Sequence, residues 1–417
     1  MFIGHAAEHV GDADVVVTST AVPADNPEVV EARRRHVPVI PRAEMLAELM
    51  RLRYGIAVAG AHGKTTTTSM IALALERGGL DPTAVIGGRL SAFGGHARLG
   101  RGEYMVVEAD ESDRSFLKLT PTIAVITNLD REHLENYGSF EELQSAFVSF
   151  ANKVPFYGAV IACADDPVLA GLRPRLTRRV ITYGFDDEAD VRGFDPTIEG
   201  FAARCRVRVA DPGGASPTAQ MRLGVPGRHN LLNALATAAV CLEVGLDLED
   251  AATALAAFGG VERRFQWKGE VGGVMVVDDY GHHPTEIQAV IASAKAGFGR
   301  RVLVAFQPHR YTRTSQLTPE FGRALAGADE IVLTDVYSAG EAPIAGATVD
   351  AIADAVRRET SSPVHVVKWL DDVPAAIAAL ARPGDLVMTL GAGSIGSVAA
   401  RVVAELDRRA GRREGVC

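Results

Sequence analysis

The stretch of the chain best suited to chemistry reads Gly60-Ala-His-Gly-Lys-Thr-Thr-Thr-Thr68 and follows a buried strand expected over Tyr54–Ala59. Glycines there let backbone N–H groups approach phosphates closely, and the helix expected over Thr65–Arg77 adds the positive end of its dipole. Lys64 would neutralise the terminal phosphates of a nucleotide, and Thr65 would place a hydroxyl on Mg²⁺. The spacing departs from the standard G-x-x-x-x-G-K-T, because position 58 is valine and the glycine is at 60. An ordinary helix start that contains Gly-Lys-Thr is the alternative. The strand–turn–helix context favours a phosphate loop made of Gly60, Ala61, His62, Gly63, Lys64, Thr65 and Thr66.

Two further polar loops follow expected strands. Glu108-Ala-Asp-Glu-Ser-Asp113 leaves the strand expected over Tyr104–Val107, and Glu108 lies where a phosphate-loop enzyme would place its second Mg²⁺ ligand. The alternative is a solvated acidic loop. Asn128-Leu-Asp-Arg-Glu-His133 leaves the strand expected over Ile123–Thr127. His133 would bind a metal as neutral imidazole, although a surface histidine is the more ordinary interpretation of that residue alone.

Pro226-Gly-Arg-His-Asn-Leu-Leu-Asn233 opens another expected helix. Asn230 and Asn233 are three residues apart and therefore share one face of that helix. They would read the edge of an adenine ring, or Asn230 would simply cap the helix.

Three polar groups end strands of a second α/β block. They are Arg263-Arg264, Asp278-Asp-Tyr-Gly-His-His-Pro284 and Gln307-Pro-His-Arg-Tyr-Thr-Arg313. Two histidines beside two aspartates suggest a metal, but the spacing matches no strong zinc signature. His309, Arg310 and Arg313 form a compact cationic cluster, and an arginine fork binds a carboxylate through two hydrogen bonds.

A different function is suggested by Gly391-Ala-Gly-Ser-Ile-Gly396, which matches the G-x-G-x-x-G pattern of NAD(P)-binding oxidoreductases. That fingerprint needs a complete βαβ unit with an acidic residue about 20 positions further on. Here the chain ends after one helix, so a tight strand-to-helix turn is the favoured interpretation.

The composition sets the class of protein. The 417 residues are 47% hydrophobic and 23% charged, with four widely spaced cysteines, which is typical of a globular protein in a reducing cytoplasm. A net charge of −9 disfavours nucleic-acid binding, and the longest apolar runs are too short to span a membrane. Short β-branched runs alternate with alanine-rich helices, for example Val302–Phe306 and Glu320–Ala326, which predicts an α/β fold with parallel sheets. Val191–Leu223 is a strand-like excursion with a turn at Asp211-Pro-Gly-Gly.

Taken together, these segments resemble the Mur ligase family of peptidoglycan-precursor enzymes. The matching stretches are Ala13–Asn26, Pro41–Arg51, Ala59–Ser69, Val107–Phe116, Asn128–His133, Pro226–Asn233, Arg263–Phe265, Asp278–Thr285, Gln307–Thr314 and Gly340–Ile344. The resemblance implies a three-domain α/β enzyme. Residues 1–52 would be a partial Rossmann-like domain for the UDP sugar, and residues 53–259 a central P-loop ATPase-like domain with a small β excursion. Residues 260–417 would be a Rossmann-like ligase domain.

The resemblance also implies a reaction and its participants. ATP and Mg²⁺ would activate the carboxylate of UDP-N-acetylmuramate as an acyl phosphate, and L-alanine would displace the phosphate. By resemblance, Lys64, Thr65 and Glu108 hold the phosphates and a first Mg²⁺, and His133 binds a second. Asn230 and Asn233 contact adenine, while Arg264 and Asp279 contact phosphate and ribose. The pocket for L-alanine is implied to consist of Tyr280, His282, His309, Arg310 and Arg313.

The chain departs from the family pattern near its start. Relatives begin with a glycine-rich βαβ unit that holds the UDP diphosphate, and this sequence is expected to lack it, with His5 as a remaining uridine contact. Ser139–Asn152 contains no lysine, so we expect no carbamylated lysine there. Two alternatives remain open, a murein tripeptide-recycling ligase and a truncated, inactive ATP-binding remnant. Gln307–Thr314 resembles the alanine-adding members and disfavours the recycling ligase.

Overall fold

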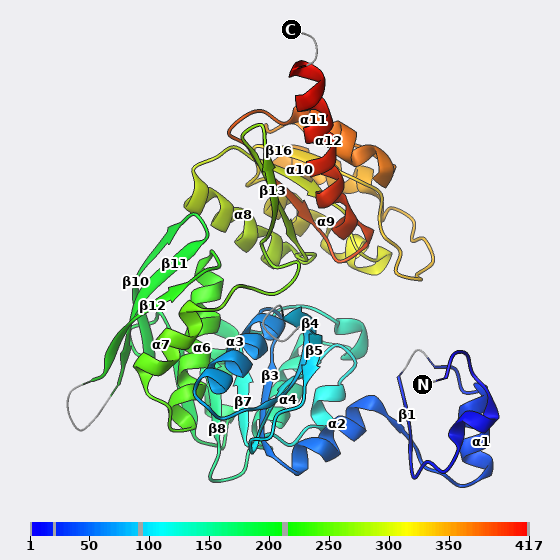
Figure 1. Ribbon diagram of the computed structural model, residues 1–417, viewed down its shortest axis with the longest axis vertical. Coiled ribbons are helices and arrows are strands. Elements are labelled where there is room, and N and C mark those ends of the chain that lie inside the picture. The colour runs from blue at the N-terminus through cyan, green and yellow to red at the C-terminus, as the bar shows by residue number, and fades with distance from the viewer. Residues whose placement is uncertain (1, 20–21, 91–94, 211–215, 415–417) are drawn as a thin grey trace. The chain divides into compact units, whose positions relative to one another are not determined.

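The computed structural model in Figure 1 describes residues 2–19, 22–90, 95–210 and 216–414. The chain forms two compact units, and each is described by itself. Unit 1 comprises Met1–Gly87, Ala97–Arg192 and Leu235–Asp247, and unit 2 comprises Gly88–His96, Gly193–Ala234 and Leu248–Cys417. In the part of the chain that is described, the helices fall short of the length and apolarity that a membrane span requires.

Among the described residues, one sheet of ten strands runs in the order β12, β11, β10, β9, β8, β7, β3, β6, β4, β5. Its strands are β3 (Tyr54–Ala59), β4 (Thr83–Leu90), β5 (Gly95–Arg98), β6 (Tyr104–Glu108), β7 (Ile123–Ile126), β8 (Ala159–Cys163), β9 (Val180–Gly184), β10 (Val191–Glu199), β11 (Ala202–Val209) and β12 (Thr218–Leu223). The pairs from β4 through β6, β3, β7, β8 and β9 to β10 are parallel. The central strands β7 and β8 are buried along their whole length, so they are apolar throughout instead of alternating.

The helices of unit 1 follow local sequence signals. α3 (Lys64–Arg77) packs against β3 and β6 and ends before a glycine pair. α4 (Phe140–Ala151) begins where the Ser139 hydroxyl accepts a hydrogen bond of 3.1 Å from the Glu142 N–H, which satisfies one of the open donors of the first turn. α5 (Pro167–Leu172) starts in the same way at Asp166.

The first part of unit 1 is small. β1 (Val16–Thr18) pairs in parallel with β2 (Val39–Pro41), and α1 (Pro27–Arg34) lies between them in sequence. α2 (Arg42–Arg51) then leads into β3. This is the strand–helix–strand arrangement expected for a partial Rossmann-like segment.

Unit 2 contains a six-stranded sheet with the order β13, β14, β18, β15, β16, β17, in which β13 pairs antiparallel with β14 and the other neighbouring strands pair in parallel. Its strands are β13 (Gln266–Val271), β14 (Val274–Asp279), β15 (Val302–Phe306), β16 (Glu330–Leu333), β17 (Val364–Val366) and β18 (Leu386–Leu390). Alternate residues of β14 and β15 belong to two separate cores. One core includes α8 (Pro284–Phe298), α9 (Tyr311–Leu325) and α10 (Val349–Glu359), and the other includes α11 (Val373–Leu380) and α12 (Val398–Glu414). Helices therefore cover both faces of this sheet, as in Rossmann-like folds.

The α/β class with parallel sheets is confirmed, and two local expectations are corrected. The sequence placed a helix over Glu320–Ala326, whereas α9 begins at Tyr311 and continues past a non-helical residue at Leu317. The helix therefore includes Arg313, which the sequence placed only in a polar group at the end of a strand. β4 and β5 were not expected, because Thr83–Leu90 contains two glycines and an arginine. The strand-like excursion is confirmed as β10–β12, while its turn at Asp211–Gly214 lies outside the described residues.

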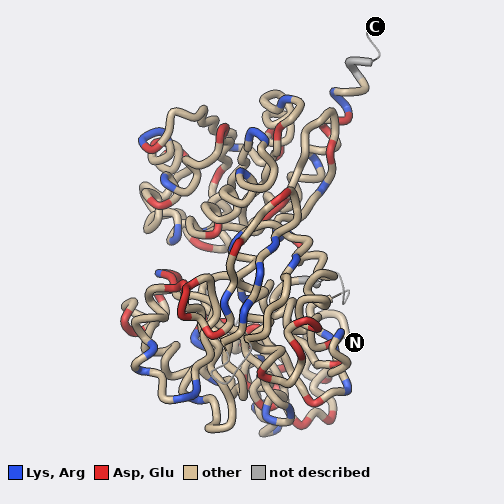
Figure 2. The backbone as a smooth tube through the Cα atoms, turned by 90° about the vertical axis from the view of Figure 1, so that its left-hand side faces the viewer, with Lys and Arg blue, Asp and Glu red and all other residues tan. Residues whose placement is uncertain are grey.

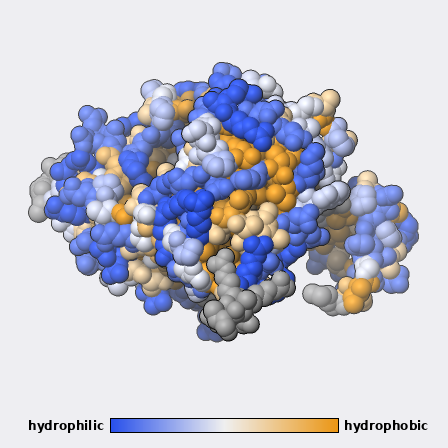
Figure 3. All heavy atoms as spheres, turned by 90° about the horizontal axis from the view of Figure 1, so that it is seen from above, coloured by the Kyte–Doolittle hydropathy of each residue, from blue (hydrophilic) through white to orange (hydrophobic). Residues whose placement is uncertain are grey.

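Lys and Arg are interspersed with Asp and Glu along the described backbone (Figure 2). The face drawn in Figure 3 is largely hydrophilic, with apolar side chains gathered over part of it. Large exposed apolar side chains include Leu99, Phe156 and Trp369.

Candidate active site

The turn between β3 and α3 is built around two glycines. Gly60 has φ of +136°, and a Cβ on it would lie 2.0 Å from Oγ1 of Thr127. Gly63 has φ of +82° and directly precedes the helix. Both positions favour glycine, because side chains rarely adopt these angles and there is no space for a Cβ at Gly60.

Residues that follow β7 hold this turn in place. The Thr127 hydroxyl donates to the His62 carbonyl at 2.6 Å. The Asn128 side chain accepts from the His62 N–H at 2.8 Å and donates to the His62 carbonyl at 3.1 Å. The loop backbone is thus fixed by the neighbouring strand end, and sequence analysis did not identify these supports.

Lys64, the first residue of α3, makes three contacts through its ammonium. It donates to the carbonyls of Gly60 and Ala61 at 2.7 and 3.2 Å and to Oε1 of Glu111 at 2.8 Å. Glu111 is 2% exposed, and its burial raises the pKa of its carboxyl group to about 7. Glu111 belongs to the acidic loop noted in the sequence, but nothing in the pattern singled it out as the partner of Lys64.

Thr65 and Glu108 lie together, as the sequence predicts. The Thr65 hydroxyl donates to Oε1 of Glu108 at 2.9 Å, and Oε2 of Glu108 accepts from the Gly87 N–H at 2.6 Å. A hydroxyl and a carboxylate side by side are hard oxygen ligands of the kind that Mg²⁺ prefers.

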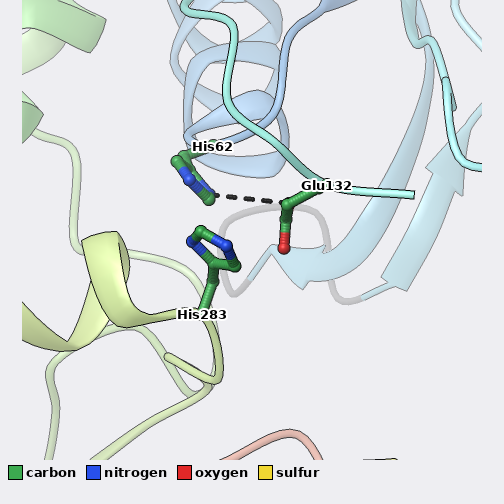
Figure 4. Close-up of side chains that lie close together, drawn as sticks. All are labelled: His62, Glu132 and His283. Atoms are coloured by element: carbon green, nitrogen blue, oxygen red, sulfur yellow. Dashed lines mark ion pairs between the residues drawn. The ribbon is translucent and has the colours of Figure 1, made fainter. Parts of the chain in front are cut away.

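The loop after β7 brings further acids to the phosphate loop. His62 contacts Asp130 at 2.9 Å and lies 3.9 Å from a carboxylate oxygen of Glu132, as Figure 4 shows for the second pair. His133 has φ of +57° and lies 3.8 Å from a carboxylate oxygen of Glu135. His62 therefore lies beside two acids of this loop, and the metal role of His133 stays a prediction.

The first turns of α6 (Arg228–Glu243) belong to unit 2 and position the two asparagines. Both are buried, and Nδ2 of Asn233 donates to Oδ1 of Asn230 at 3.3 Å, so they do share a face. Asn230 is the third residue of the helix, and its Nδ2 donates to the Pro226 carbonyl at 2.6 Å. The helix-cap alternative is therefore wrong in position, because the helix begins two residues earlier.

A second group of candidate site residues lies in unit 2, and Glu286 on α8 contacts several of them. Its carboxylate accepts from the Arg264 guanidinium at 3.3 Å and from the His282 N–H at 3.1 Å. The Arg264 guanidinium also lies 5.2 Å from the centre of the Tyr280 ring. A pocket of about 420 Å³ borders Arg264 and is lined in part by Phe265 and Trp267. Sequence reasoning missed Glu286.

Asp279 at the end of β14 is buried and orders the chain around it. Its two carboxylate oxygens accept from the N–H groups of Phe265 and Gly281 at 2.7 and 2.6 Å. Burial raises the pKa of Asp279 to about 6, against the opposing effect of Arg264. The ribose contact expected of Asp279 stays a prediction beside this structural role.

Four of the five residues expected for the amino-acid pocket lie close together. The rings of Tyr280 and His282 are 5.3 Å apart, and those of His282 and His309 are 5.8 Å apart. Arg313 contacts Nδ1 of His309 at 3.4 Å. Arg310 is exposed, with φ of +71°, just before α9.

Two histidines in unit 2 are held neutral. Burial together with Arg313 and Arg310 lowers the pKa of His309 to about 4. Burial and Arg264 lower the pKa of His229 to about 4 as well. At neutral pH the positive charge beside His309 therefore comes from the arginines.

His5, the expected uridine contact, lies in the small first part of unit 1. Its Nδ1 is 3.0 Å from the Glu28 carboxylate, which also contacts His9 at 2.9 Å. The structure therefore gives His5 an acidic partner on α1, and its contact with a nucleotide stays a prediction.

The Gly391–Gly396 turn is filled by the protein's own side chains. Oε1 of Gln307 accepts from the Ile395 N–H at 3.0 Å and the Ser394 hydroxyl at 3.2 Å. Arg263 donates to the Gly391 carbonyl at 2.6 Å. The glycines are thus explained by close packing within unit 2.

Comparison with known proteins adds an independent line of evidence. The chain matches the profile of the Mur ligase family catalytic domain over residues 1–54, the Mur ligase middle domain over 58–241 and the Mur ligase glutamate ligase domain over 263–393. A UDP-N-acetylmuramate–L-alanine ligase of Anaeromyxobacter sp. (strain Fw109-5) is 54% identical over 392 residues, which cover 94% of this chain and 84% of that protein. The chain belongs to the Mur ligase family.

Other relatives agree with this Mur ligase assignment. The protein of the same name from Myxococcus xanthus is 53% identical over 94% of this chain and 83% of its own length. The crystal structure of UDP-N-acetylmuramate-alanine ligase MurC from Thermotoga maritima matches with a TM-score of 0.80 and 30% identity, covering 98% of this chain and 88% of that one. A murein peptide ligase from Psychrobacter arcticus matches with a TM-score of 0.67 and 25% identity, covering 97% and 88%. The three-domain Mur ligase architecture is thereby confirmed, and the oxidoreductase interpretation of Gly391–Gly396 is set aside.

Proposed function

We propose that this Mur ligase joins L-alanine to the carboxylate of UDP-N-acetylmuramate at the expense of ATP. The observation that carries the proposal is the Lys64 loop with its Thr65–Glu108 pair, in a chain 54% identical to a protein named for that reaction. A carboxylate is a poor acyl donor until it is phosphorylated. The reaction therefore proceeds through an acyl phosphate, and the amine of alanine then forms the amide as phosphate leaves.

The phosphate loop carries the first step. The γ-phosphoryl group passes from ATP to the sugar carboxylate, and negative charge develops on the transferred group and on ADP. Lys64 supplies a positive charge there, and the N-terminus of α3 adds its dipole. Preorganised groups of this kind account for much of an enzyme's rate enhancement, because they need not reorient during the reaction.

Thr65 and Glu108 are the residues that would hold Mg²⁺. Their oxygens, 2.9 Å apart, suit a hard cation, and a bound Mg²⁺ supplies charge neutralisation at the phosphates. His133 remains the proposed second metal ligand. Asn230, Asn233, Arg264 and Asp279 are the proposed contacts for the adenine, phosphate and ribose of the nucleotide.

The residues around His309 in unit 2 would bind the amino acid. Arg313 and Arg310 are the proposed partners of the alanine carboxylate, because they are the cations beside neutral His309. Tyr280 and His282 would close the pocket around the small side chain. We assign residues 1–52 to the sugar-binding domain, 53–259 to the ATP-binding domain and 260–417 to the ligase domain, and the family matches over residues 1–54, 58–241 and 263–393 support this division.

The decisive experiment measures phosphate release from ATP and Mg²⁺ with UDP-N-acetylmuramate, with and without L-alanine. Release that requires both substrates supports the proposal. A parallel reaction with the tripeptide L-alanyl-γ-D-glutamyl-meso-diaminopimelate in place of alanine tests the recycling ligase, and a preference for the tripeptide would overturn our assignment. ATP binding without ligation of either substrate would instead indicate an inactive ATP-binding remnant.

A further inference from the structure

The Lys64 ammonium has three N–H donors, and in this structure three protein acceptors occupy them. Two are carbonyls of its own loop, at Gly60 and Ala61, and the third is the Glu111 carboxylate at 2.8 Å. A phosphate group that binds Lys64 must therefore replace one of these acceptors.

Of the three acceptors, Glu111 would lose the most stabilisation if Lys64 turned to a phosphate. Its side chain is 2% exposed, and its Oε2 has no hydrogen-bond partner among the described residues. The Tyr137 hydroxyl bonds the Glu111 carbonyl and fixes the backbone rather than the carboxylate. Lys64 is therefore the charge that compensates this buried carboxylate, and an unpaired buried carboxylate is costly.

We propose that Glu111 is a positioning residue that competes with the nucleotide for Lys64 and sets how tightly the phosphates are held. This inference rests on the proposed function, since it assigns Lys64 to the phosphates. Lys64 then pairs alternately with the Glu111 carboxylate and with a phosphate of the nucleotide. A phosphate that takes Lys64 leaves Glu111 uncompensated beside added negative charge, so Glu111 weakens nucleotide binding. The return of Lys64 to Glu111 favours the departure of ADP.

Protonation of Glu111 relieves this competition. The charged and titratable groups around it are Lys64 on α3, Asp110 on its own loop and Tyr137 after η3 (Leu134–Asn136), with Glu108 and Glu132 also acting on Lys64. Burial raises the pKa of Glu111 to about 7, and Lys64 opposes the increase. When Lys64 turns to a phosphate, the opposing effect is lost, the pKa rises further, and Glu111 takes up a proton from solvent. Nucleotide affinity should therefore fall as pH rises above about 7.

The test compares wild-type protein with Glu111→Gln, which keeps the shape and removes the charge. Binding of MgATP and MgADP alone is measured by calorimetry at pH 7.5, without the ligase substrates. We expect the variant to bind both nucleotides about tenfold more tightly, because a neutral amide holds Lys64 less strongly than a carboxylate does. In turnover, KM for ATP should fall, and kcat should fall where ADP release limits the rate. Weaker or unchanged binding would show that Glu111 merely anchors Lys64 and would overturn the inference.

Controls separate the possible causes. Glu141→Gln removes an exposed carboxylate at the start of α4 and should leave nucleotide affinity at the wild-type value. Measured from pH 7 to 9, the affinity of the wild type and of Glu141→Gln should decline more steeply than that of Glu111→Gln. The ionisation of ATP itself is common to all three proteins. Equal slopes would contradict the proton-linked competition. Wild-type protein that binds no nucleotide at all would instead contradict the proposed function.

Discussion

Two strand-to-helix turns in this protein have similar backbone geometry but differ in the contacts that their residues make. Gly60 follows β3 with φ of +136°, and Gly391 follows β18 with φ of +142°. In both, a Cβ would collide with a neighbouring segment, at 2.0 Å from Thr127 Oγ1 and at 2.7 Å from the Gln307 carbonyl. A glycine in such a turn thus reports close approach of the chain to itself, whether or not a ligand binds there.

The residues after each glycine make the difference. After Gly60 come Lys64 and Thr65 at the start of a long helix, both in contact with carboxylates. After Gly391 the turn passes through a short 3₁₀ segment, η6 (Ser394–Ser397), whose Ile395 N–H is already taken by Gln307. In unit 2 the candidate site residues lie elsewhere, and they include the side chains after the neighbouring strand β15, where His309 and Arg313 are found.

The largest effect on turnover is expected when the Lys64 charge is removed from the first turn. Lys64→Ala should lower kcat by about 10²–10³-fold or more, because it removes a preorganised charge at the transferred phosphoryl group. It also leaves Glu111 uncompensated and should destabilise the fold, so the double variant Lys64→Ala/Glu111→Gln is measured beside it. We expect the double variant to regain stability in urea unfolding but not turnover. Near-normal turnover in either protein would contradict the role of Lys64.

The next largest effect is expected from a substitution in the proposed L-alanine pocket. Arg313→Ala should raise KM for L-alanine by about 10–100-fold, the cost of losing a hydrogen-bonded charge, while KM for ATP changes little. Arg323→Ala is the matched control, because Arg323 lies on the same helix in an exposed pair with Glu320. Steady-state kinetics in both substrates decide the matter, and a change confined to KM for ATP would refute the assignment.

The second turn should matter for stability and not for nucleotides. Gly391→Ala should reduce the free energy of unfolding by about 1–3 kcal/mol, because alanine disfavours this φ and meets the Gln307 backbone. Gly411→Ala, in α12 with open space around it, should change stability by no more than about 1 kcal/mol, in the stabilising direction. Chemical denaturation measures both. Unfolding curves that coincide for Gly391→Ala and wild type would show that the turn tolerates a side chain.

The last prediction concerns the pH dependence of stability, which has opposite signs in the two units. His229 has a lowered pKa of about 4, so the unfolded chain binds more protons between pH 4 and 6.5, and stability falls as pH drops through that range. Glu111 has a raised pKa of about 7, so its contribution is lost as pH rises from 4.5 to 7. Each contributes up to about 1.4 kcal/mol per pH unit. Stability measured against pH for His229→Gln and Glu111→Gln should differ from wild type with opposite slopes, and parallel curves would exclude both assignments.

Much of the fold could be read from the sequence because its signals are local. Buried parallel strands such as β7 and β8 are continuous apolar runs, and Ser139 and Gly78 mark helix ends by their own hydrogen-bonding and backbone preferences. β4 and the first turns of α9 escaped prediction. The glycines of Thr83–Leu90 and the residues around Pro319 disfavour the structure that strand pairing and packing against the sheet impose.

The sequence by itself determined the chemical inventory: a lysine and a threonine at a strand-to-helix turn, acids at the next strand end, and a cationic cluster in the second block. Only the tertiary structure decided which of them meet. Lys64 finds Glu111 across 47 residues, Arg264 finds Glu286 across 22, and Gln307 reaches Ile395 across 88. Parallel strands place the ends of distant segments at the same edge of a sheet, and burial there favours the contacts that satisfy each charge or N–H group.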